Sequence, residues 1–228
     1  MRIVALLPMK GNSERVPGKN FKPLGHKPLF RWMLDTLIEI DQIEEVIINT
    51  DAEAELVGAG LDVNAPAFAK VRFRQRKESL LGDFTSMNLI IQDDIDAVPA
   101  DCYLMTHVTN PFISAETVQR AIEAFQNDPD KDSLFAVNRF QTRFYEEDGT
   151  PVNHDPNNLI RTQDLTPWYE ENSCLYLFTA ESFAATQARI GNKPILFETP
   201  RLESVDIDEP EDWDLAATLS QSLFANKT

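Results

Sequence analysis

Short apolar runs alternate with amphipathic stretches along most of this 228-residue chain. Turn-forming residues bound each apolar run, and the runs are rich in branched and aromatic side chains, which is typical of strands buried in a sheet. The strands that we predict in this way span residues 3–8, 45–50, 71–75, 101–107, 133–138, 173–179 and 195–198.

The amphipathic stretches carry apolar residues three or four positions apart, which predicts helices. Asp51 and Thr85 or Ser86 precede two of them and have the short polar side chains that cap helix N-termini. The predicted helices span residues 28–38, 52–57, 86–94, 114–125, 180–189 and 211–224. This alternation predicts an α/β fold, a mostly parallel mixed sheet flanked by helices in a Rossmann-like arrangement.

The alternation stops between residues 139 and 172. Two strong turn signals, at 146–151 and 153–158, interrupt this stretch. The chain length suits one domain. We therefore interpret 139–172 as a hairpin excursion from a single domain that comprises residues 1–228.

The composition narrows the class of protein. No apolar run approaches the roughly 20 residues that cross a bilayer, and the N-terminus lacks the pattern of a signal peptide. A formal net charge of −16 argues against nucleic acid as a partner. Cys102 and Cys174 belong to no metal-binding motif. We expect a cytoplasmic protein with two buried thiols, no membrane and no nucleic acid.

A cationic loop follows the first predicted strand. Five cations lie between residues 10 and 27, against the single anion Glu14: Lys10, Arg15, Lys19, Lys22 and Lys27. Ligands of open α/β sheets bind at the carboxyl ends of strands, so this loop predicts a site for a polyphosphate. The spacing of Gly11 and Gly18 excludes a Walker A motif. A solvated loop with scattered lysines is the alternative.

Asp206 and Asp208 form a second candidate site. In an extended segment residues two apart point to the same side, so the two carboxylates are placed to share Mg²⁺ with a bound triphosphate. The alternative is structural, with Asp208 capping the last helix.

Two further polar segments are candidates for binding a second substrate. Gln163 and Asn172 carry amides suited to hydroxyl groups, and Arg161 is suited to a carboxylate. His107 and Thr109 follow the fourth predicted strand. A polar loop before an edge strand, and a structural histidine, are the alternatives.

Several of these segments together resemble the CMP-sugar synthetases, the acylneuraminate cytidylyltransferases. Their nucleotide loop reads roughly Pro-Ala-Arg-Gly-Gly-Ser-Lys-x-x-Pro-x-Lys-Asn, followed by Leu-x-Gly-Lys-Pro-Leu. The positions that match this loop are Pro8, Gly11, Ser13, Pro17, Lys19, Asn20, Leu24, Lys27, Pro28 and Leu29. The family's Arg-Pro-x-x-Leu-x-x-Asp, Arg-x-Gln-Asp and Asp-Ile-Asp elements align with residues 76–83, 161–164 and 206–208.

The resemblance covers residues 2–217 and implies a fold of the nucleotide-diphospho-sugar transferase type. It implies a cytidylyltransferase that joins CTP to a 2-keto-3-deoxy sugar acid, giving a CMP-sugar and pyrophosphate. The implied residues are catalytic Lys10 and Lys19; nucleotide-binding Lys10, Gly11, Ser13, Arg15, Lys19, Asn20 and Arg76; sugar-binding His107, Thr109, Arg161, Gln163 and Asn172; and magnesium-binding Asp206 and Asp208. It also implies a homodimer, with residues 140–172 reaching toward the partner.

Departures from the family pattern occur in two places. In the loop, Lys10, Asn12 and Glu14 replace arginine, glycine and lysine. In the sugar pocket the family has Gln, Ser and Arg where this chain has His107, Asn110 and Ile113. Three alternatives therefore stay open: transfer of another nucleotide or to another substrate, a GT-A glycosyltransferase, and a non-catalytic nucleotide-binding homologue.

Overall fold

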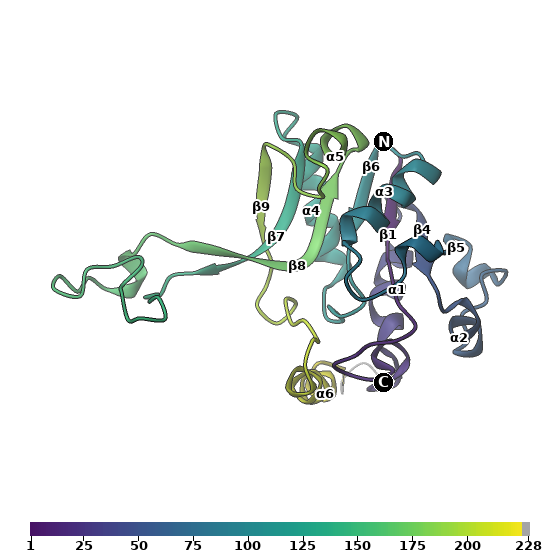
Figure 1. The fold of residues 1–228 in the computed structure, drawn as a ribbon, viewed down its shortest axis with the longest axis horizontal. Helices are drawn as coiled ribbons and strands as arrows, with labels where there is room; N and C mark the ends of the chain where they lie inside the picture. Colours follow the sequence, from purple (N-terminus) through teal and green to yellow (C-terminus); the bar gives the residue numbers. More distant parts are fainter. Residues whose placement is uncertain (225–228) are drawn as a thin grey trace.

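The computed structural model describes residues 1–224, and a seven-stranded sheet forms its centre (Figure 1). The strand order across the sheet is β5-β4-β1-β6-β8-β7-β9. The strands are β1 (Ile3–Leu6), β4 (Ile43–Thr50), β5 (Val71–Gln75), β6 (Cys102–Met105), β7 (Ser133–Phe140), β8 (Trp168–Phe178) and β9 (Pro194–Glu198). A small antiparallel pair, β2 (Pro23–Leu24) and β3 (Lys27–Pro28), lies in the N-terminal loop.

Strand β8 alone runs opposite to its neighbours. It pairs antiparallel with β6 and with β7, whereas β1, β4, β5 and β6 pair in parallel and β7 pairs in parallel with β9. The helices of the structure are α1 (Leu29–Glu39), α2 (Glu53–Gly58), α3 (Met87–Ala97), α4 (Ala115–Gln126), α5 (Ala180–Thr186) and α6 (Pro210–Phe224). The predicted fold class, a mostly parallel mixed sheet flanked by helices, is confirmed.

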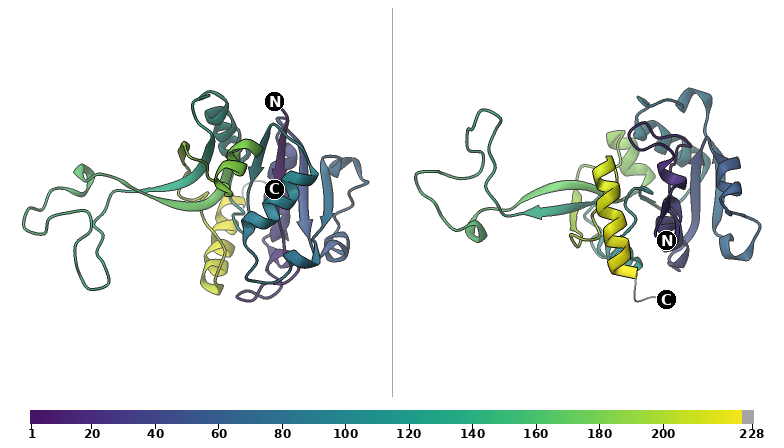
Figure 2. Two further views of the ribbon diagram at one scale, coloured as in Figure 1. Left: turned by 45° about the horizontal axis from the view of Figure 1, so that its top comes forward. Right: turned by 90° about the horizontal axis from the view of Figure 1, so that it is seen from below.

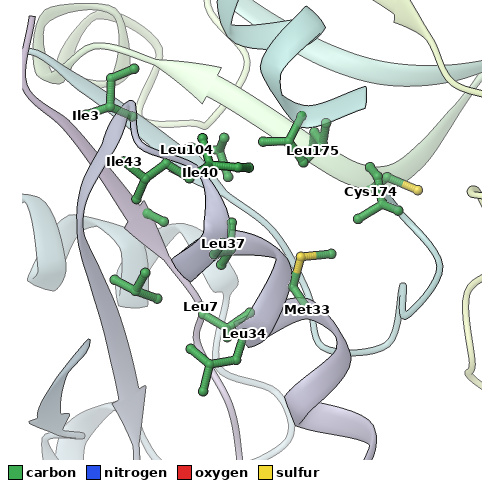
Figure 3. Packing of buried hydrophobic residues seen from close by; sticks show 14 of the residues in the cluster. Ile3, Leu7, Met33, Leu34, Leu37, Ile40, Ile43, Leu104, Cys174 and Leu175 are labelled. Atoms are coloured by element: carbon green, nitrogen blue, oxygen red, sulfur yellow. The ribbon is translucent and has the colours of Figure 1, made fainter. Parts of the chain in front are cut away.

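Alternate side chains of the strands build a core on each face of the sheet. Ile3 and Ala5 of β1 pack with α1 and α4 on one face, and Figure 3 shows part of this cluster. Val4 and Leu6 pack with α3 and α5 on the other face. Because side chains alternate along a strand, a run that is apolar at every position serves both layers.

A third apolar cluster holds the C-terminal segment against the N-terminal loop. Ile207 and Trp213 are buried there with Val16, Leu24 and Trp32. The backbone N–H of Ile207 also donates to the carbonyl of Thr109 at 2.9 Å. This packing brings the Asp206–Asp208 segment next to the cationic loop, far from it in the sequence.

The excursion leaves the body of the molecule as a two-stranded arm. Strands β7 and β8 stay paired from Val137–Glu171 to Phe140–Trp168, and the chain between them extends beyond the sheet (Figures 1 and 2). We predicted that this strand begins at residue 173, but β8 begins at Trp168. It lies inside the sheet between β6 and β7. Its polar first half pairs with β7 without facing a core.

Two local predictions were wrong. We predicted that Asp51 caps the helix that follows it, but the N-cap of α2 is Ala52, which has no side-chain cap. The carboxylate of Asp51 accepts a hydrogen bond from the N–H of Gly11 instead. Helix α5 ends at Thr186 and not at residue 189, because Gln187 adopts the left-handed conformation with φ of 55°. In residues 1–224 no helix combines the length and apolar character needed to cross a bilayer.

Candidate active site

A cavity of about 480 Å³ opens beside the carboxyl ends of β1 and β6. It is the place where open α/β sheets bind their ligands. Ten predicted site residues line it: Lys10, Ser13, Arg15, Lys19, Asn20, Arg76, His107, Thr109, Asp206 and Asp208. The cavity therefore joins the cationic loop to the distal carboxylates.

Lys19 connects these two parts of the cavity. Gly18, with φ of 65°, turns the chain into a short 3-10 helix that begins at Lys19. The Lys19 ammonium is buried, donates to the carbonyl of Ile207 at 2.5 Å and lies 3.5 Å from Asp208 Oδ1. A buried cation in this position favours negative charge on whatever enters the cavity.

The loop is shaped by close contacts of its backbone. A Cβ at Gly11 would lie 2.8 Å from the Cβ of Ala52, so glycine lets the loop approach α2. The side chain of Asn20 donates to the carbonyl of Lys10 at 2.8 Å. Gly11 itself lies behind the cavity lining, while Ser13 and Asn20 are part of it.

Lys10 and Arg15, the other loop cations that line the cavity, are paired with carboxylates. Lys10 Nζ lies 2.5 Å from Asp83 Oδ1, and this hydrogen bond holds the pKa of Asp83 below its usual value. Arg15 pairs with Asp208 at 3.0 Å and with Glu209 at 2.9 Å. An entering polyphosphate would compete with exposed carboxylates for these cations, a modest cost because such surface pairs are weak.

Arg76 is held in one position by the protein itself. It is buried and donates to the carbonyls of Met9 and Asn49, and to the side chain of Asn49 at 3.1 Å. Asn49 in turn donates to the buried carboxylate of Asp94 at 2.8 Å. Burial lowers the pKa of Arg76 and raises that of Asp94 to about 6.

Asp206 and Asp208 fit a divalent cation that has other oxygen ligands as well. Asp206 Oδ1 is buried without a hydrogen-bond partner. Burial raises the pKa of Asp206, a hydrogen bond with Thr109 opposes this rise, and the charge of Asp208 adds to it. Within the described residues, His, Cys, Asp and Glu form no metal-binding group of three or more. Two carboxylates plus phosphate oxygens match the way Mg²⁺ is bound in nucleotide enzymes. Asp212, in the first turn of α6, accepts hydrogen bonds from the backbone N–H groups of Asp208 and Glu209.

His107, Thr109 and Ser173 also line the cavity. His107 accepts a hydrogen bond from Arg189 at 3.4 Å between Nε2 and the guanidinium. Burial, and then the charge of Arg189, lower the pKa of His107 to about 4. Ser173 has φ of 60°, in the left-handed region that residues other than glycine rarely adopt.

Three predicted sugar-binding residues lie outside the cavity. Arg161 and Gln163 belong to the excursion, where Arg161 pairs with Asp164 at 2.7 Å. Asn172 is buried and donates to Asn138 and Thr199, so its amide serves the protein interior. The single chain does not bring these three side chains to the site.

Sequence reasoning missed other lining residues, among them Asp83, Thr85, Met87, Ile90 and Ser173. Asp83 ended a segment that we had aligned with the family. Met87 and Ile90 gave only the helical periodicity of α3. Their position at the cavity depends on how α3 packs on the sheet, which periodicity does not reveal.

A cationic loop at the first strand that faces a carboxylate pair across one cavity is the arrangement of a nucleotidyltransferase. The chain belongs to the cytidylyltransferase family, whose model matches residues 4–225. This confirms the predicted family and the predicted enzyme class. The family match excludes the alternative that the chain is a GT-A glycosyltransferase.

Two relatives match this chain over nearly their whole length. The pseudaminic acid cytidylyltransferase of Campylobacter jejuni is 26% identical over 96% of both chains. The CMP-N,N'-diacetyllegionaminic acid synthase of Legionella pneumophila is 28% identical over 97% of both.

Solved structures support the fold alone. A CMP:2-keto-3-deoxy-manno-octonic acid synthetase complexed with CTP covers 98% of this chain and 100% of its own, with a TM-score of 0.66 and 14% identity. The 4-diphosphocytidyl-2C-methyl-D-erythritol synthase of Anaerococcus prevotii has a TM-score of 0.69 and 14% identity, over 96% of each chain.

Proposed function

We propose that this cytidylyltransferase joins CTP to a 2-keto-3-deoxy sugar acid. The anomeric hydroxyl oxygen attacks the α-phosphorus, the bond from this phosphorus to the bridging oxygen of the β-phosphate breaks, and the hydroxyl proton is lost. The products are a CMP-sugar and pyrophosphate. The observation that carries the proposal is Lys19, a buried cation between the loop and the carboxylate pair in one cavity.

The chain's part in this reaction is positioning and charge compensation. Lys10 and Lys19 neutralise the triphosphate and the departing pyrophosphate. The loop around Gly11 and Ser13 offers backbone N–H groups to phosphate oxygens, and Arg15 adds a further cation. Asn20 and the immobilised Arg76 contact the cytidine portion.

Asp206 and Asp208 would hold Mg²⁺, which supplies charge neutralisation at the phosphates when bound. Lys19, 3.5 Å from Asp208 Oδ1, balances part of the charge of that carboxylate. The unpartnered oxygen of Asp206 supports this role because a buried, charged acceptor without a donor is costly in a purely structural segment.

The sugar acid occupies the part of the cavity beside His107 and Thr109, which are among its lining residues. The names of two relatives refer to pseudaminic acid and to CMP-N,N'-diacetyllegionaminic acid. Activity with a panel of sialic, pseudaminic, legionaminic and octulosonic acids, measured as pyrophosphate release with CTP and Mg²⁺, tests the proposal. UTP and ATP are the matched controls. Turnover of UTP at the rate of CTP, or no pyrophosphate with any of these acids, contradicts it.

We also propose that the protein is a homodimer in which the excursion docks on a second copy. The excursion and the start of β8 expose several large apolar side chains: Tyr145, Leu159, Ile160, Trp168 and Tyr169. A partner surface would cover them and would give Arg161 and Gln163 a route to the partner's cavity. Sedimentation of the wild type against a Leu159→Glu, Trp168→Glu double variant tests this, and a monomeric wild type refutes it.

A further inference from the structure

Arg189 reaches His107 from outside the cavity. It follows α5 in the chain, two residues after Gln187, whose left-handed conformation ends that helix. One guanidinium nitrogen of Arg189 lies 3.4 Å from His107 Nε2. The sequence predicted a helix over residues 180–189 that includes this arginine, but α5 ends at Thr186.

The guanidinium of Arg189 is held by groups around it. It lies 3.8 Å from the centre of the Tyr176 ring and 3.2 Å from Glu171 Oε1. The hydroxyl of Tyr176 donates to the same carboxylate. Only a fifth of the Arg189 side chain is exposed, so the group has little freedom to turn away from His107.

This contact determines which nitrogen of His107 carries hydrogen. A guanidinium has five N–H donors and no acceptor, so Nε2 must accept and cannot itself be protonated. A neutral imidazole with a free lone pair on Nε2 has its hydrogen on Nδ1. Within the described residues, Nδ1 of His107 has no hydrogen-bond partner, and His107 lines the cavity.

We propose that Arg189 is a positioning residue that keeps His107 as the Nδ1–H tautomer, so that His107 donates a hydrogen bond to an oxygen of the acceptor substrate. The substrate half of this inference rests on the proposed function. The carboxylate, carbonyl and hydroxyl oxygens of a sugar acid are all acceptors for such a donor. His107 then takes no proton from the reacting hydroxyl, because its only lone pair faces Arg189.

The tautomer is measured directly by two-bond ¹H–¹⁵N correlation spectra of protein labelled at histidine. The chain has three histidines, His26, His107 and His154, and the signals that disappear in His107→Gln identify the one of interest. At pH 7 we expect a protonated Nδ1 and an unprotonated Nε2. An Nε2–H form, or a doubly protonated ring, overturns the inference without reference to any activity.

Arg189→Met keeps the apolar stem over Tyr176 and removes every donor. We expect the tautomer of His107 to shift toward Nε2–H, and the KM for the acceptor to rise about fivefold to tenfold with the KM for CTP unchanged. Arg189→Lys, which can still donate to Nε2, should restore much of both. Arg120→Met is the matched control, since Arg120 also lies over an aromatic ring, Phe197, but is exposed and outside the cavity.

Three outcomes of the variant experiments count against the inference. An unchanged tautomer in Arg189→Met refutes the positioning role. A shifted tautomer with an unchanged KM for the acceptor refutes the substrate half. If the wild type turns over no sugar acid, the proposed function fails and takes the substrate half with it, while the spectrum of the wild type still decides the tautomer.

Discussion

The two carboxylates of the proposed metal site should respond to amide substitution with opposite changes in stability. Asp206 Oδ1 is buried and unpartnered, whereas Asp208 pairs with Arg15 and Lys19. In Asp206→Asn the buried charge disappears and its shape remains. In Asp208→Asn, Arg15 and Lys19 lose the negative charge with which they pair.

The magnitude follows from these environments. A buried acceptor atom left without a donor costs roughly 1–3 kcal/mol, and more when it is charged; because asparagine keeps some of the polarity, we expect Asp206→Asn to gain about 1 kcal/mol. For a chain of this size that raises Tm by about 2–4 °C. Asp208 is about half exposed, so Asp208→Asn should lose up to about 1 kcal/mol.

The gain in Asp206→Asn should depend on pH. Burial and then Asp208 raise the pKa of Asp206 in the folded protein above its unfolded value. The wild type therefore loses stability as pH rises from the unfolded value, about 3.9, through the raised folded value. The advantage of asparagine is present at pH 7 and vanishes below about pH 4.

Thermal melts of both variants without Mg²⁺ and CTP measure these effects, with pyrophosphate release measured alongside. Both variants should lose at least about a hundredfold in kcat/KM. A lower Tm for Asp206→Asn at pH 7, or an equal change in Tm for the two variants, would refute the assignment of Asp206 as a carboxylate kept for a cation.

Three further substitutions test other parts of the site. Lys19→Met should lower kcat/KM for pyrophosphate release at least about a hundredfold, because it removes the buried cation, and a smaller loss would contradict its catalytic role. Gly11→Ala should raise the calorimetric Kd for CTP about tenfold, because its Cβ meets Ala52, and adding Ala52→Gly should reverse the effect; no reversal would show that the contact is not the cause. Asn172→Ala should cost about 3 kcal/mol in denaturant unfolding, because it leaves Thr199 and a backbone N–H unpaired; an unchanged midpoint would favour a role in binding alone.

The sequence alone predicted the elements whose character is local. Strand β5 spans the predicted residues 71–75, because its alternation is complete within the run. Strand β8 starts earlier than predicted, because its polar first half, with Glu170 and Glu171, is held by pairing with β7 and not by burial. The predicted cap at Asp51 failed for a similar reason, since a distant N–H competes for its carboxylate.

Site residues were predictable where a local sequence pattern indicated their chemistry. They were not predictable where their position depends on tertiary packing. The loop and the Asp206–Asp208 pair each showed a charge pattern, and family resemblance joined them. The contact between Arg189 and His107 has no local signature, because it depends on where α5 ends and on the ring of Tyr176. Asn172 shows the converse. The sequence predicted that its amide binds a sugar, but in the structure this amide donates hydrogen bonds to buried groups of the protein.

The contact between Lys19 and Ile207 joins residues 188 positions apart, which has a consequence for biosynthesis. At about 5–20 residues per second, a ribosome adds residues 206–208 roughly 10–40 seconds after Lys19. During that time the nascent chain presents its cationic loop without the acidic segment opposite. A truncated product that ends before residue 206 retains the residues of every strand of the sheet, yet it lacks Asp206 and Asp208, which we propose to hold a metal ion beside the triphosphate.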